Sequence, residues 1–344
     1  MKIGLIGYKG SGKSTLFEWL TRISADPALA HGTQSAMAPV PEPRVPLLCE
    51  IYKPKKITYA ALEIVDTPGL NRDQHGNPGR LAHLRECDSI VCVVGVFDGA
   101  DPEKEIAAFS EELLLADLEI VENRLVKVKE QKRRPLPKID QDRILFEYET
   151  LQVVQKALES GKPLREDQLT DGQSKVTRAF RLLSEKPRMV LINTADDETD
   201  FDKYAQFSTP VVPAVAVSVG LETELEKMPP DERTAFLEEL GLKSSDRDAV
   251  VRMILDASGQ SLFFTAGDKE VRTWLIRKNA TALEAAGAIH TDMAKGFIRA
   301  EIIKCDDLLR LGSERAVKAE NLARREHKDY VLQDGDIVLF HFSS

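Results

Sequence analysis

A glycine-rich loop that directly follows an apolar run is the feature that most constrains this chain. Residues 3–6 predict a buried strand, and residues 7–15 read GYKGSGKST, the G-x-x-x-x-G-K-[ST] pattern. In this pattern backbone N–H groups and a helix N-terminus face phosphates, Lys13 neutralises the β- and γ-phosphate oxygens, and the Ser14 hydroxyl ligates Mg²⁺. The pattern predicts a strand–loop–helix unit that binds a nucleoside triphosphate, against the alternative of a glycine-rich turn before an ordinary helix. The predicted nucleotide-binding residues of this loop are Gly7, Lys9, Gly10, Ser11, Gly12, Lys13, Ser14 and Thr15.

A second motif predicts a switch. Residues 60–65 predict another strand, which ends in Asp66-Thr67-Pro68-Gly69, the D-x-x-G pattern of switch GTPases and their relatives. Asp66 would hold Mg²⁺ through a water and the Gly69 N–H would contact the γ-phosphate, so Lys13, Asp66 and Gly69 are the predicted catalytic set and Ser14 and Asp66 the predicted metal set. Alone, D-x-P-G is also a common turn. Leu70 falls where signalling GTPases keep a water-orienting glutamine, which predicts slow intrinsic hydrolysis.

A third motif predicts the base side of the nucleotide site. After the apolar residues 189–192, Asn193-Thr194-Ala195-Asp196 takes the place of the base-reading N-K-x-D sequence, with its lysine missing. A strand over residues 211–217 would then deliver Ser218 to the same side. The predicted base-side residues are Asn193, Thr194, Asp196 and Ser218. This ordered set favours a switch-type NTPase over a small-molecule kinase.

Composition is that of an ordinary globular protein. The chain has 344 residues, of which 42% are hydrophobic and 30% charged, enough for two or three domains. A formal charge of −9 disfavours a generally basic nucleic-acid binder, so any RNA contact would come from a local patch. We expect no signal peptide and no membrane-spanning run, and therefore a cytoplasmic protein.

An insertion of helical, highly charged sequence follows at residues 101–186. Its first helix carries apolar residues at spacings of three and four, which predicts a coiled-coil seam: Ile106, Phe109, Leu113, Ala116 and Ile120, and then Val121, Leu125 and Val128. A turn at residues 135–137 leads to a second helix, so the pair should form an antiparallel arm. The tip is basic, with Lys127, Lys129, Lys132, Arg133, Arg134 and Lys138. These cations could contact an RNA backbone or simply complement a solvated helix end.

The region from Gly259 onward predicts a small α+β module. Strand-like runs cover residues 261–265, 271–276, 296–303 and 336–341, with a helix over 281–286. This order is typical of a β-grasp fold.

The chain resembles the YchF family of Obg-like ATPases almost from end to end. The resemblance rests on residues 7–15 and 66–70, on Pro39-Val40-Pro41-Glu42-Pro43-Arg44, on residues 53–57, and above all on residues 263–272, 289–292 and 295–301. It implies an α/β P-loop G domain (residues 1–100 and 187–258) interrupted by a helical coiled-coil arm (101–186) and followed by a β-grasp TGS domain (259–344). It also implies Mg²⁺-dependent hydrolysis that often prefers ATP, and association with ribosomes in translation or stress control, with the ribosome or ribosomal RNA as partner.

Three regions of the chain depart from the family pattern. In the phosphate loop the family usually has asparagine where this chain has Gly10 and proline where it has Lys9, so a monovalent-cation role for that asparagine does not transfer. The switch threonine falls at Ala30, with Thr33 the nearest substitute. The segment that often carries a histidine is shortened at residues 99–102, which leaves His75 as a candidate replacement against the alternative of a solvated loop residue.

Two classes of function fit these residues. One is a slow molecular switch whose state a large partner reads; the other is a nucleotide-dependent binding module in which hydrolysis is incidental. A metabolic kinase is a third class, but no acceptor pocket or arginine-bearing lid is visible. Asp196 could read guanine, whereas the missing lysine and the family's N-x-x-E pattern favour adenine, so we expect ATP to bind at least as tightly as GTP.

Overall fold

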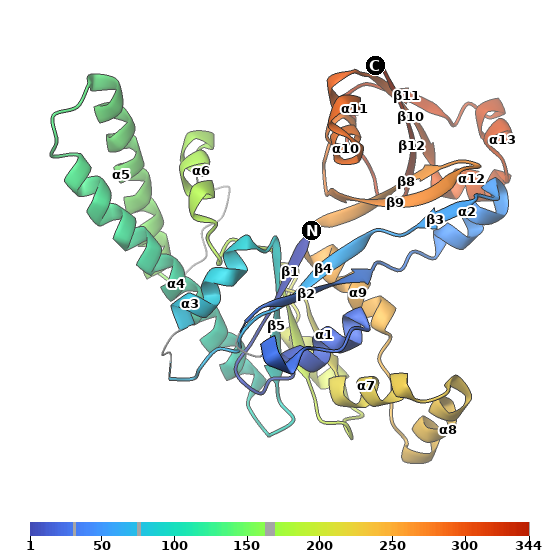
Figure 1. Cartoon of the computed structure of the whole chain (residues 1–344), viewed down its shortest axis with the longest axis horizontal. Helices are drawn as coiled ribbons and strands as arrows, with labels where there is room; N and C mark the ends of the chain where they lie inside the picture. Colours follow the sequence, from blue (N-terminus) through green and yellow to red (C-terminus); the bar gives the residue numbers. More distant parts are fainter. Residues whose placement is uncertain (30–31, 74–76, 162–168, 344) are drawn as a thin grey trace. The chain divides into compact units, whose positions relative to one another are not determined.

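The computed structural model of the protein describes residues 1–29, 32–73, 77–161 and 169–343 (Figure 1). The chain divides into two compact units: residues 2–36 with 64–245, and Met1 with 37–63 and 246–344. The fold contains two six-stranded sheets, together with helices. No helix among these described residues is both long enough and apolar enough to cross a bilayer.

The first sheet carries the nucleotide motifs. Its strand order is β2-β4-β1-β5-β6-β7, and β1, β5, β6 and β7 pair in parallel. The strands are β1 (Lys2–Ile6), β2 (Gln34–Pro39), β4 (Ala61–Asp66), β5 (Ser89–Gly95), β6 (Arg188–Asn193) and β7 (Ala214–Val217). β5 and β6 are buried over nearly their whole length, as expected for parallel strands covered on both faces. β7 begins at Ala214 rather than at the expected Val211, because Pro213 has no N–H to donate to a neighbouring strand.

Helices surround this sheet and extend from it. They are α1 (Lys13–Thr21), α3 (Asn77–Ala82), α4 (Pro102–Gln131), α5 (Lys138–Glu159), α6 (Asp171–Thr177), α7 (Val219–Lys227) and α8 (Pro230–Leu240). α4 and α5 lie side by side and are joined by a short turn at their far end, so the predicted antiparallel arm is present (Figure 1).

The predicted coiled-coil seam is wrong for the first half of α4. Phe109, Leu113 and Ala116 pack into the core beneath the sheet, with residues of β5 and β6. A helix that lies on a sheet shows the same three-and-four spacing as a coiled-coil strand, so the sequence pattern could not tell the two apart. The second half of α4 packs on α5, through Val121 and Val128 against Leu151, Val154 and Leu158.

A buried carboxylate anchors the root of the arm. Asp117 on α4 is fully buried and accepts hydrogen bonds from Arg85 Nη1 (2.8 Å), from the backbone N–H groups of Leu183 (2.9 Å) and Ser184 (2.8 Å), and from Ser184 Oγ (2.7 Å). These bonds fix the point at which the chain returns from the arm to β6. The buried charge is compensated by one cation and three further donors, as a buried carboxylate requires.

The second sheet is mixed and contains the C-terminal strands. Its order is β11-β10-β12-β8-β9-β3, and its strands are β3 (Lys56–Thr58), β8 (Gln260–Ala266), β9 (Glu270–Arg277), β10 (Phe297–Lys304), β11 (Arg324–Glu326) and β12 (Asp336–Phe342). The accompanying helices are α2 (Arg44–Tyr52), α9 (Arg247–Ala257), α10 (Ala282–Ile289), α11 (Thr291–Lys295), α12 (Cys305–Leu311) and α13 (Glu314–Ala319). Ala282, Ala285 and Ala286 of α10 pack on Phe263 of β8 and Val338 of β12. A capping box between Thr281 and Glu284 begins α10.

The middle of segment 37–63, which contains α2 and β3, and segment 246–258 pack with this C-terminal sheet, although the sequence assigned both to the G domain; the two ends of segment 37–63 belong to β2 and β4 of the first sheet. β3 is the parallel neighbour of β9, with Ile57 opposite Val271. Val45 and Leu48 of α2 are buried in the same core as Phe264 and Ile337. The other predicted domain boundaries stay predictions.

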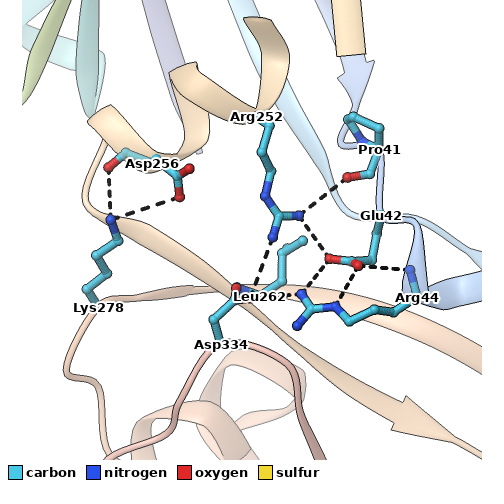
Figure 2. A network of polar contacts seen from close by, with 8 residues as sticks. All are labelled: Pro41, Glu42, Arg44, Arg252, Asp256, Leu262, Lys278 and Asp334. Atoms are coloured by element: carbon cyan, nitrogen blue, oxygen red, sulfur yellow. Dashed lines mark hydrogen bonds and ion pairs between the residues drawn. The ribbon is translucent and has the colours of Figure 1, made fainter. Parts of the chain in front are cut away.

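A network of charged side chains holds segment 37–63 in place (Figure 2). The Glu42 carboxylate is fully buried and lies between Arg44, which donates two hydrogen bonds of 2.7 Å, and Arg252 of α9, whose Nη1 lies 2.9 Å from Oε2. Arg44 also donates to Asp334 Oδ2 (2.8 Å), and Asp334 Oδ1 accepts from the Leu262 N–H of β8 (3.0 Å). The network therefore joins four separate stretches of the sequence.

Candidate nucleotide site

The glycine-rich loop lies between β1 and α1, as predicted. Gly10 and Gly12 have φ of +85° and +91°, a region that glycine enters without steric cost. A Cβ atom at Gly12 would lie 2.2 Å from Asn193 Nδ2, so this position also requires glycine for space; nothing lies within 4 Å of a Cβ atom at Gly10. The first N–H groups of α1, from Lys13 onward, have no acceptor within the helix and can serve an anion.

Lys13 begins α1 with its side chain folded over the loop. The side chain is buried, and Nζ donates to the Tyr8 carbonyl oxygen (3.2 Å). Burial lowers the pKa of Lys13 below its usual value, the Asp66 charge opposes that shift, and the nearby positive charge of Arg80 adds to it. Triphosphate oxygens would supply the negative charge that this buried cation favours.

Ser14 and Asp66 meet at the end of β4. Ser14 Oγ donates to Asp66 Oδ2 (2.7 Å), and Gln34 Nε2 at the start of β2 donates to the same oxygen (3.2 Å). Within the described part of the chain, the buried Asp66 Oδ1 and Ser11 Oγ atoms have no hydrogen-bond partner. A hydroxyl and a carboxylate with an uncommitted oxygen are the hard oxygen donors that Mg²⁺ prefers, so these residues fit the cation.

Residues Gly69 and Leu70 are attached directly to the phosphate loop. Leu70 N donates to the Gly7 carbonyl (2.9 Å) and Lys9 N donates to the Leu70 carbonyl (3.0 Å). A Cβ atom at Gly69 would lie 2.9 Å from Lys13 Nζ, so the Gly69 backbone lies against the ammonium group. The Leu70 side chain is fully buried in the core beneath the sheet. It therefore cannot reach a water at the phosphates.

The predicted base-side residues come together between the ends of β6 and β7. Asn193 joins the loops, because Nδ2 donates to the Ser11 carbonyl (3.1 Å) and Oδ1 accepts from the Val219 N–H (3.1 Å). Thr194 Oγ1 and Ser218 Oγ share a hydrogen bond of 2.7 Å, and both side chains are buried. The exposed Asp196 places Oδ1 2.8 Å from the Leu221 N–H at the N-terminus of α7. One oxygen of the Asp196 carboxylate therefore already accepts a hydrogen bond from the protein backbone.

Three polar residues near this site gave no signal in the sequence. Gln34 reaches Asp66, while Arg80 on α3 donates through Nη1 to the Gly69 carbonyl and to Asn71 Oδ1 (2.9 Å). Arg72 lies over the Tyr8 ring, with 4.9 Å from its guanidinium carbon to the ring centre, and pairs with Glu105 of α4. The contacts of Gln34 and Arg72 join residues more than 30 positions apart, those of Arg80 span 9 and 11 positions, and none belongs to a short motif. The candidate positions Ala30 and His75 lie outside the described residues, and no partner within the described residues identifies Thr33 as a substitute.

Comparison with known proteins assigns the chain to a family. A family model described as "50S ribosome-binding GTPase" matches residues 2–124, and YchF-GTPase_C, described as "Protein of unknown function", matches residues 261–343. The "Ribosome-binding ATPase YchF" of Bacillus subtilis is 33% identical over 99% of this chain and 98% of its own length. The chain belongs to the YchF family. An "Obg-like ATPase 1" of Oryza sativa subsp. japonica is 35% identical, covering all of this chain and 92% of that protein.

A solved structure of a YchF protein agrees with this assignment. The YchF GTPase of Schizosaccharomyces pombe matches with a TM-score of 0.81 and 28% identity, over 99% of this chain and 97% of that one. The family resemblance and the α/β fold class predicted from the sequence are therefore confirmed. The chain is a P-loop NTPase of the YchF type.

Proposed function

We propose that this protein is a Mg²⁺-dependent NTPase that binds ATP and hydrolyses it slowly. The observation that carries the proposal is the convergence of Lys13, Ser14 and Asp66 on the glycine-rich loop, with the Gly69 backbone against the Lys13 ammonium. Each of these groups has a place at a triphosphate: Lys13 neutralises charge, and Ser14 and Asp66 hold the metal. Bound Mg²⁺ would neutralise phosphate charge, and Gln34 would orient the Asp66 carboxylate beside it.

We expect the base site to prefer adenine, or to discriminate only weakly between adenine and guanine. Guanine is read by a carboxylate that accepts from both its N1–H and its 2-amino group. Asp196 Oδ1 already uses one of its lone pairs for the Leu221 N–H, so this carboxylate has fewer acceptor sites left for guanine. The relatives are named ATPases, which agrees with this reasoning. ATP therefore binds at least as tightly as GTP in our proposal.

Slow turnover follows from the buried Leu70. A hydrocarbon side chain enclosed in the core cannot hydrogen-bond an attacking water. We expect a rate for the isolated protein near the ~10⁻⁴–10⁻² s⁻¹ of switch NTPases without a stimulating partner.

The switch segment is connected to the arm, which suits a protein whose nucleotide state is read by a partner. Arg72 pairs with Glu105, and Asn77 Nδ2 donates to the buried Glu112 carboxylate (3.1 Å), so the residues after Gly69 contact α4 at two places. α4 is one continuous helix of 30 residues that runs on into the arm. A rearrangement after loss of the γ-phosphate would thus act on the arm helix.

The proposed partner is the ribosome, and the proposed location is the cytoplasm. The arm tip would bind ribosomal RNA, and the C-terminal TGS-like domain would provide a second contact. The relatives' names include ribosome binding, and the six tip cations named above are all exposed. An exposed basic helix end attracts a phosphate backbone electrostatically. The alternative function, a nucleotide-dependent binding module, keeps this partner but makes hydrolysis incidental.

Turnover with and without ribosomes separates the two functions. A switch should hydrolyse ATP at least about 10-fold faster with ribosomes, as partner-stimulated switches do, whereas a binding module should bind ribosomes with unchanged turnover. Arg133→Ala/Arg134→Ala should weaken ribosome binding and flatten its salt dependence, and Lys203→Ala/Lys227→Ala is the control that removes two exposed cations elsewhere. Failure of the wild-type chain to hydrolyse ATP under either condition would contradict the enzymatic proposal.

A further inference from the structure

Arg80 occupies a place beside the phosphate loop that no motif assigns to it. It lies on α3 and is half-buried, and its Nη1 donates to both the Gly69 carbonyl and Asn71 Oδ1. Both acceptors belong to the segment that follows Asp66. The guanidinium group therefore holds the stretch of backbone that carries the predicted γ-phosphate contact.

Gly69 lies between two cations. On one side, a Cβ atom placed on Gly69 would lie 2.9 Å from Lys13 Nζ. On the other, Arg80 Nη1 donates to the Gly69 carbonyl oxygen. Glycine has the widest conformational freedom of any residue, so its N–H points reliably only if neighbouring peptides are held. The peptide group between Gly69 and Leu70 is held at both of its polar atoms: its carbonyl oxygen accepts from Arg80 Nη1, and its N–H donates to the Gly7 carbonyl.

We propose that Arg80 is a positioning residue for hydrolysis, which acts through Gly69 to hold the backbone N–H at the γ-phosphate. In hydrolysis, negative charge shifts among the phosphate oxygens, and donors that are already fixed in place stabilise that charge without reorganising. Leu70 supplies no such help from its side chain. This inference rests on the proposed ATPase activity and assigns Arg80 a role in it.

Substitution of Arg80 would have different effects on rate and affinity if the residue were purely structural. An arginine that only tied α3 to the loop would affect stability or nucleotide binding, and would leave the rate of the bound complex unchanged. A positioning residue changes the rate at saturation more than the affinity, because the oriented N–H matters most as charge develops.

The test is single-turnover hydrolysis at saturating ATP and Mg²⁺, measured beside ATP affinity and thermal unfolding. Arg80→Ala should lower the rate about 10- to 100-fold, as loss of a group that orients a direct contact commonly does, with affinity changed less than about 3-fold. Arg80→Lys should recover part of the rate, since an ammonium can still bind the Gly69 carbonyl. Arg178→Ala, which removes an exposed arginine of the same unit, is the matched control and should behave as wild type.

Two results would overturn the inference while the proposed function stands: an Arg80→Ala rate within about 2-fold of wild type, or loss of affinity and rate in equal measure in both variants. If Arg80→Ala does not fold, Arg80→Met, which keeps most of the side-chain length and removes the donor, is measured in its place and judged by the same criteria. A wild-type chain that bound no ATP would instead overturn the proposed function and this inference with it.

Discussion

The Glu42 network yields a prediction that links a buried charge to acid stability. Glu42→Gln keeps the shape of the side chain and removes its charge, whereas Arg252→Ala keeps the charge and removes one of its two guanidinium partners (Figure 2). We expect both changes to destabilise the C-terminal unit at pH 7, with Arg252→Ala leaving a fully buried carboxylate to a single arginine.

The magnitude follows from the contacts that are lost. Arg252 contributes one close bond to Glu42, of 2.9 Å, a marginal one to the Pro41 carbonyl, of 3.4 Å, and an ion pair of 3.5 Å with the half-exposed Asp334. A hydrogen bond to a charged group is worth about 1.5–3 kcal/mol. Complete loss of the partners of a buried charge costs about 3–5 kcal/mol, but Arg44 remains, so we expect a loss of about 2 kcal/mol.

The pH dependence has a definite sign. Burial alone would raise the pKa of Glu42, but the hydrogen bonds from Arg44 and Arg252 together outweigh burial, and the pKa lies below its usual value of 4.5. A lowered pKa in the folded state means that the ionised carboxylate stabilises the protein above pH 4.5, the unfolded-state value, and that this stability is lost as the pH falls through the folded-state value. The free-energy difference between wild type and Glu42→Gln should therefore begin to shrink as the pH falls below 4.5 and should go on shrinking down to the lower folded-state value.

The two tryptophans make the measurement specific to one unit. Trp274 lies on β9 in the C-terminal unit and Trp19 on α1 in the other, so a Trp19→Phe background leaves a single reporter of the C-terminal unit. Urea unfolding followed by Trp274 fluorescence at pH 7 and pH 4 gives the free energies without assuming that both units unfold together. A stability difference between wild type and Glu42→Gln that stayed constant, or grew, toward low pH would refute the reasoning.

Two further predictions concern the other unit. Lys13→Ala should abolish tight ATP binding and leave the fold intact, because a charge-assisted bond of about 1.5–3 kcal/mol is lost along with the cation itself; unchanged affinity in a fluorescent-nucleotide titration would contradict the site. Asp117→Ala should lower the unfolding free energy by about 3–5 kcal/mol, because Arg85 and three other donors lose their shared acceptor; urea unfolding followed by Trp19 in a Trp274→Phe background checks it, and a change below about 1 kcal/mol would contradict it.

Local patterns in the sequence predicted the motif-bearing strands β1, β4 and β7 of the first sheet and the loops that follow them, whereas β2 and β5 were not predicted. The strand–glycine loop–helix order around residues 3–15 and the strand that ends at Asp66 depend on neighbours in sequence, so composition and spacing suffice. The four main strands of the C-terminal region and α10 were also predicted, because turn residues and a capping box mark their ends.

What the sequence could not give depends on distant contacts. The three residues of β3 carry no strand signal of their own and are fixed by pairing with β9, more than 200 positions later. The apolar residues of α4 recur at a spacing that suits packing on a sheet as well as packing on a second helix. Which of the two forms depends on the surface that the folded protein places against α4. Arg80 and Gln34 meet Gly69 and Asp66 only once the sheet is formed, and no spacing rule points to such pairs.

Calorimetric titration of the wild-type chain with ATP and with GTP, in the presence of Mg²⁺, tests the central claim most directly. The account predicts binding of ATP at least as tight as that of GTP, because Asp196 already accepts a hydrogen bond from the Leu221 N–H. Lys13→Ala provides the control for heat that does not come from the phosphate loop. A preference for GTP above about 10²-fold, or some 2.7 kcal/mol, would show that Asp196 reads guanine, and absence of binding by either nucleotide would contradict the site itself.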